Sequence, residues 1–84
     1  MPTVLKIGGF RFIIWPADHE PPHVHVFKGG GEAKITLGDK ECRPSFVTIA
    51  GLTKPDARKA WEIVAEHQKV LLKAWEKIHG NLDN

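Results

Sequence analysis

The spacing of apolar residues in this chain changes once, close to residue 53. Up to about residue 50, apolar and polar side chains alternate in segments such as "FRFIIW" and "EAKITL", and a period of two is typical of strands with one buried face. Beyond it, apolar residues recur at intervals of three or four, the spacing of one helix face; they are Ala57, Ala60, Trp61, Val64, Leu71, Trp75 and Ile78. The two periods in this order predict an α+β fold.

Glycines and prolines divide the first part into short segments. The glycines at 8–9 and 29–31 provide hairpin turns, because glycine readily adopts the positive φ that such turns need. Pro21-Pro22 cannot belong to a central ladder and therefore connects strands. We predict an antiparallel meander of four or five strands: residues 3–7, 10–15, 23–28, 32–37 and, as an edge strand after Pro44, 45–50.

The turns also predict which residues share a face. Pairing across Gly8-Gly9 puts a mostly apolar set on one face, namely Leu5, Ile7, Phe10, Phe12 and Ile14. In the second hairpin, a four-residue loop aligns Val26 with Ala33 and His25 with Lys34, whereas a three-residue loop would set His25 beside Ile35. Since two valines are cheaper to bury than two imidazoles, the first register is favoured, with the histidines on the face away from the helix.

The helical segment carries clear start and stop signals. Thr53 can cap the first turn, which holds Pro55 and Asp56, and Gly80 ends the pattern. A helix over residues 54–79 would span about 39 Å at about 1.5 Å per residue, whereas a six-residue strand covers about 20 Å. The helix must overhang the sheet, break near His67-Gln68, or pack against a second copy. Together with three tryptophans, this predicts a homodimer.

Composition limits the class of protein. The 84 residues fit one domain, here a meander over residues 1–50 with the helical segment 53–79 packed on one face. A net charge of +2 does not by itself indicate a nucleic-acid binder. Cys42 is the single cysteine, so no disulfide is expected within one chain. The start "MPTVLKIGGF" lacks the apolar run of a signal peptide. We expect a cytoplasmic protein with no membrane contact.

The segment "ADHEPPHVHVFKGGGEAKI", residues 17–35, holds the candidate functional residues. His23 and His25 at i and i+2 of a strand point the same way and can chelate one ion, such as zinc or another transition metal. His19 is a candidate third ligand, and Asp18 or Glu20 can supply an oxygen. Apart from such a metal ion, no cofactor is expected.

A second possibility is proton transfer without a metal. His23 and His25 can act as general base and general acid, and Lys34 can stabilise developing negative charge. These groups are sufficient for a metal-independent ribonuclease toxin. The alternative is a solvated polar face, so whether the chain is an enzyme stays open.

Binding without chemistry is the main prediction. An open sheet face would join the two histidines to Lys6, Arg11, Phe27 and Lys34, combining stacking groups with positive charge as in single-stranded RNA binders. The same face can bind a partner protein, and "HVHVF" can form an edge for strand addition. His67 is expected at the core edge, bonded to a backbone carbonyl.

Four segments together resemble one small bacterial family, domain of unknown function 4160: "MPTVLKIGGFRF", "HEPPHVHV", "GEAKI" and "EHQKVLLKAWEKIHG". The resemblance covers essentially the whole chain, and "PPHVHV" is its most specific element. It implies a small protein encoded beside another short gene, in the manner of a toxin–antitoxin pair, and hence a small cognate partner protein. It implies no catalytic residue.

Overall fold

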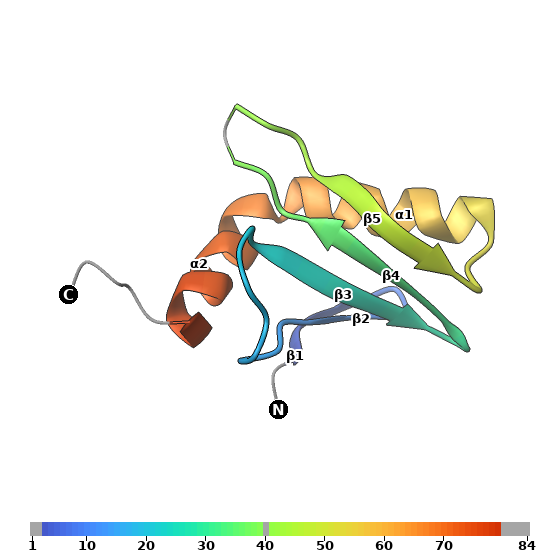
Figure 1. The fold of residues 1–84 in the computed structure, drawn as a ribbon. Coiled ribbons are helices and arrows are strands. Elements are labelled where there is room, and N and C mark those ends of the chain that lie inside the picture. The colour runs from blue at the N-terminus through green and yellow to red at the C-terminus, as the bar shows by residue number, and fades with distance from the viewer. Residues whose placement is uncertain (1–2, 40, 80–84) are drawn as a thin grey trace.

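Residues 3–39 and 41–79, which the computed structural model describes, form a five-stranded antiparallel sheet and two helices (Figure 1). The sheet is a meander in chain order: β1 Thr3–Ile7, β2 Phe10–Ile13, β3 His23–Lys28, β4 Gly31–Thr36 and β5 Ser45–Ala50. The predicted α+β meander is confirmed. β2 ends at Ile13 rather than at residue 15, and β4 lies one residue earlier than predicted.

Both predicted hairpin registers are confirmed. In the first hairpin, Ile7 pairs with Phe10 and Lys6 with Arg11. In the second, Val26 pairs with Ala33 and His25 with Lys34. The ladder continues to the pair Lys28 and Gly31, so Gly29 and Gly30 alone make the turn. Val24 and Val26 therefore face the core, and His23 and His25 face the other way.

The helical segment breaks at His67, one of the three predicted outcomes. α1 spans Lys54–Glu66 and α2 spans Gln68–His79. Thr53 caps α1 as predicted, its side chain accepting a hydrogen bond from the Asp56 N–H at 3.2 Å. At His67 the backbone leaves helical geometry, with φ −112° and ψ 23°. α1 runs along the sheet, and α2 turns past the end at which β3 begins (Figure 1). Neither helix in these residues is long and apolar enough to cross a membrane.

The core lies between the helices and one face of the sheet. Val24, Val26, Ile35 and Leu37 are fully buried, and burying one such side chain contributes about 1.5–3 kcal/mol. The other core residues are Phe10, Phe12, Ile14, Ala33, Ala60, Ile63, Val64, Leu71 and Trp75. Leu5 and Ile7, expected in the core, are partly buried and pack against it.

β3 is the middle strand of the sheet, so the prediction that "HVHVF" forms an edge is wrong. Both flanks of β3 are occupied, by β2 and by β4. Within the described residues the edges of the sheet are β1 and β5. His25 is therefore held from both sides, by β2 and β4, whereas His23 pairs with β4 alone.

Candidate metal centre

The connection between β2 and β3 places a carboxylate beneath the start of β3. The Trp15 N–H donates to Asp18 Oδ2 at 3.0 Å, and the Asp18 N–H donates to the Trp15 carbonyl at 3.0 Å. This tight turn fixes the Asp18 side chain. Pro21-Pro22 then returns the chain into β3.

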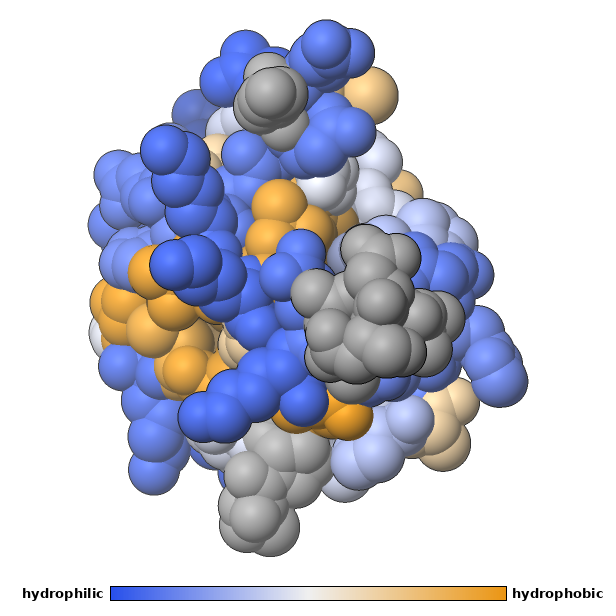
Figure 2. Space-filling view, turned by 90° about the vertical axis from the view of Figure 1, so that its left-hand side faces the viewer, coloured by the Kyte–Doolittle hydropathy of each residue, from blue (hydrophilic) through white to orange (hydrophobic). Residues whose placement is uncertain are grey.

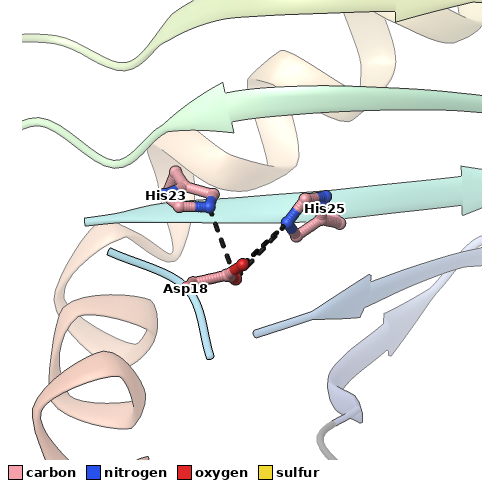
Figure 3. Close-up of side chains that lie close together, drawn as sticks. All are labelled: Asp18, His23 and His25. Carbon is pink, nitrogen blue, oxygen red and sulfur yellow. Dashed lines mark hydrogen bonds and ion pairs between the residues drawn. The ribbon is translucent and has the colours of Figure 1, made fainter. Parts of the chain in front are cut away.

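Asp18, His23 and His25 converge on one point (Figure 3). Asp18 Oδ2 lies 3.3 Å from His23 Nε2 and 3.3 Å from His25 Nε2. One ligand atom from each of the three residues lies within 4.8 Å of the other two. The histidines share this direction because they are two positions apart on one strand.

The ring of His23 has a defined orientation. Its Nδ1 lies 2.9 Å from the Pro21 carbonyl oxygen. A carbonyl only accepts, so Nδ1–H is the donor, and in the neutral ring Nε2 carries a lone pair. His23 is 4% exposed, and its Nε2 is buried without a hydrogen-bond partner. A buried lone pair facing a carboxylate is unfavourable, so this contact needs either a proton on Nε2 or a metal ion between the two groups.

Asp18 is poised to stay ionised. Partial burial raises its pKa, but the hydrogen bond from the Trp15 N–H and the neighbouring His23 and His25 outweigh that effect, so the pKa of Asp18 lies below its ordinary value. The site therefore keeps a negative charge at neutral pH, which favours a bound cation.

A cavity of about 320 Å³ opens beside the cluster. Asp18 and His23 line it, together with His19, Glu20, Lys34 and Thr36. His19 is exposed and lies outside the group of clustered ligand atoms in the described chain, whereas Asp18 lies within it. The Glu20 carboxylate instead accepts a hydrogen bond from Trp75 Nε1 at 3.2 Å. Of the two oxygen donors considered from sequence, only Asp18 reaches the histidines.

The predicted polar face is present beside this cluster, but it is not open at His23. Lys6, Arg11 and Phe27 are cross-strand neighbours in one row, and the Arg11 guanidinium lies 5.9 Å from the Phe27 ring centre. His25 and Lys34 form the next row. Lys6 and Arg11 are exposed.

α2 covers the end of this face. The Trp75 ring centre lies 5.2 Å from that of His23, which explains why His23 is buried. Nothing in the local sequence of either residue signals this contact, since the two are far apart in the chain. His67 behaves as predicted: its Nδ1 lies 2.9 Å from the Ile63 carbonyl oxygen.

Comparison with known proteins gives one finding. A family model described as "Domain of unknown function (DUF4160)" matches residues 9–76, a range that contains Asp18, His23 and His25. No curated protein and no solved structure matches the chain.

Proposed function

The chain belongs to the DUF4160 family, whose description names no activity, and we propose from the site itself that Asp18, His23 and His25 bind a divalent transition-metal ion. The observation that carries this proposal is the convergence of two histidine Nε2 atoms on Asp18 Oδ2, with the Nε2 of His23 buried and without a hydrogen bond.

The spacing of the donor atoms supports this proposal. Nitrogen and oxygen ligands lie about 2.0–2.1 Å from Zn²⁺, so two ligands at a tetrahedral angle lie about 3.3–3.4 Å apart. Asp18 Oδ2 lies 3.3 Å from each histidine Nε2. The Nδ1–H of His23 donates to a backbone carbonyl, the usual second partner of a metal-binding histidine. Imidazole and carboxylate donors suit zinc, and also iron, copper or nickel.

Three protein ligands would leave a coordination position for water or substrate, as in catalytic rather than structural zinc sites. A metal bound there supplies Lewis acidity and lowers the pKa of a coordinated water. The chain itself contributes Lys34, beside His25 on the neighbouring strand and at the wall of the cavity. Its ammonium can hold an anionic group next to the cluster.

Metal titration by calorimetry tests the proposal. The wild-type chain should bind one Zn²⁺ or Ni²⁺, and His25→Ala and Asp18→Asn should bind at least about tenfold more weakly. His19→Ala is the matched control, since it removes a nearby histidine outside the cluster, and it should bind as the wild type does. If His19→Ala weakened metal binding and Asp18→Asn did not, this ligand set would be wrong.

RNA binding on the polar face is the second candidate function. The row of Lys6, Arg11 and Phe27, with Arg11 against the aromatic ring, supports it. Arg11→Ala should weaken binding of a single-stranded RNA without changing metal affinity.

If His23, His25 and Lys34 instead form a metal-independent ribonuclease, cleavage of RNA should persist in EDTA and be lost in His25→Ala.

A further inference from the structure

β5 is an edge strand with no charge or proline of its own, although a bulge interrupts its pairing with β4 between Lys34 and Ile35. Its sequence, "SFVTIA", contains no charged residue and no proline, and all six residues are exposed. Phe46, Val47 and Ile49 are 37%, 51% and 48% exposed. By contrast, apolar side chains lie in separate patches among hydrophilic ones on the end of the molecule seen in Figure 2.

Such an edge has a physical consequence. Its outward backbone N–H and C=O groups are a template for another strand, and proteins normally block that template with charges, prolines, bulges or short strands. Of these, β5 has only the bulge. β5 is as long as β3 and β4, and its residues have high strand propensity. The same features that make it an aggregation hazard make it suited to strand addition.

The surroundings of β5 indicate what the added strand carries. A groove of about 590 Å³ lies between β5 and α1, with Pro44, Phe46, Ala57 and Trp61 as its apolar lining. Lys54 and Arg58 stand at its wall. The Arg43 guanidinium lies 5.2 Å from the Trp61 ring centre. Across residues 3–39 and 41–79, none of these three cations takes part in an ion pair.

We propose that β5 and this groove bind an extended segment of a partner protein, which adds to the sheet as a further strand and carries both apolar and acidic side chains. Its backbone pairs with β5, its apolar side chains cover Phe46 and Trp61, and its carboxylates meet Lys54 and Arg58. Charge selects this occupant over a second copy of the chain, because a second copy would bring the same cations to the groove.

Two short capped peptides of the length of β5 test the proposal on the full chain. One carries both valine and glutamate at the alternate positions that share one strand face, with threonine between them, and the other carries lysine in place of each glutamate. The glutamate peptide should shift the backbone amide resonances of β5 and slow their hydrogen exchange, and the lysine peptide should do neither. The double variant Lys54→Glu/Arg58→Glu should bind the glutamate peptide at least about tenfold more weakly and gain affinity for the lysine peptide. Both substitutions are exposed on α1, so the fold should survive, which circular dichroism checks.

The matched control is Lys73→Glu/Lys77→Glu, which makes the same change in net charge on the exposed surface of α2. It should bind both peptides as the wild type does. Equal binding of the two peptides, or no response in β5, would overturn the proposal. Protection of β5 that grows with protein concentration alone would assign the edge to a second copy. If a single-stranded oligonucleotide rather than the peptide slowed hydrogen exchange in β5, Lys54 and Arg58 would bind phosphate groups instead of carboxylates. Either result would also overturn it.

Discussion

At the scale of single residues, His23 differs most from its neighbour His25. The His25 side chain is 20% exposed, whereas that of His23 is 6% exposed. His23 also donates to the Pro21 carbonyl and lies against Trp75. Two histidines two positions apart on one strand thus have different roles: His23 supports the fold as well as the cluster, and His25 contributes mainly to the cluster.

His23→Ala should therefore destabilise the metal-free protein by roughly 2 kcal/mol, because it opens a cavity beside Trp75 and removes the donor to the Pro21 carbonyl. His25→Ala should cost clearly less. Urea unfolding in the presence of a chelator measures both values. Equal losses would show that the burial of His23 under α2 contributes nothing.

Asp18 predicts the pH dependence of stability. The pKa of Asp18 is lower in the folded state than in the unfolded chain. When the pH falls below the ordinary pKa of a carboxyl group, roughly 4, the unfolded state therefore binds more protons than the folded state does. The stability that Asp18 contributes is thus complete above that pH and is lost as the pH falls through the folded-state pKa. Metal-free Asp18→Asn, which keeps an acceptor for the Trp15 N–H, should show a flatter stability profile between pH 3 and 5. If Asp18→Asn and the wild type lost stability equally in acid, the pKa of Asp18 would be the same in the folded and unfolded states.

At the scale of elements, Gln68 joins the helix break to the loop between β4 and β5. Its side-chain amide donates to the carbonyls of Leu37, Asp39 and Cys42 at 2.7, 2.9 and 3.2 Å. Gln68 is the first residue of α2, so one side chain fixes both the loop and the point at which the helix changes direction.

Gln68→Glu should lower the free energy of unfolding by about 1–3 kcal/mol, because a carboxylate cannot donate and would face three carbonyl oxygens. The neighbouring exposed Lys69→Ala is the control and should change stability by less than about 0.5 kcal/mol. Chemical denaturation compares the two. If Gln68→Glu behaves like the control, the loop does not depend on this contact.

The glycines at 29–31 have different structural roles. A Cβ on Gly31 would clash with the backbone carbonyl of Gly51, where the ends of β4 and β5 meet, whereas a Cβ on Gly30 would meet nothing within 4 Å. Gly31→Ala should separate this end of the sheet and destabilise the protein by roughly 1–3 kcal/mol. Gly30→Ala, one residue away, should be nearly neutral. The thermal unfolding midpoints of the two variants give the comparison, and a reversed order would contradict the close approach.

At the scale of the whole molecule, the helix break changes the expectation for self-association. A homodimer was predicted because the helical segment is longer than the sheet and because the chain has three tryptophans. The break at His67 lets α2 turn past the sheet end, and the Trp61 and Trp75 Nε1 groups donate within the same chain, to the Pro44 carbonyl and to Glu20. The length argument for a dimer no longer applies. Trp15 is 40% exposed, and the exposed apolar residues within the strands lie on β5.

Light scattering at micromolar concentration should therefore report a monomer when no partner is present. A stable dimer would instead restore the original prediction. Ile49→Lys would then show whether β5 forms the contact, since a charge on that edge should return the protein to monomers. If this variant stayed dimeric, the contact would lie elsewhere on the molecule.

The sequence by itself determined most of the elements and the registers of the β1–β2 and β3–β4 hairpins. Alternation, paired glycines, the Thr53 cap and the shared direction of His23 and His25 all depend on residues a few positions apart, where backbone geometry limits the choices. The same local rules allowed a helix break near His67 but left three outcomes open. They named the histidine pair, and with it both His19 and Asp18 as possible ligands.

Only the tertiary structure decided which of these meet. Asp18 reaches the histidines because the Trp15–Asp18 turn and the Pro-Pro connection bring it back to β3. His23 is buried because α2 turns at His67 and brings Trp75 against it. The groove beside β5 exists because α1 packs next to that strand. Each outcome depends on the path of the chain between distant residues, and non-local packing rather than periodicity sets that path.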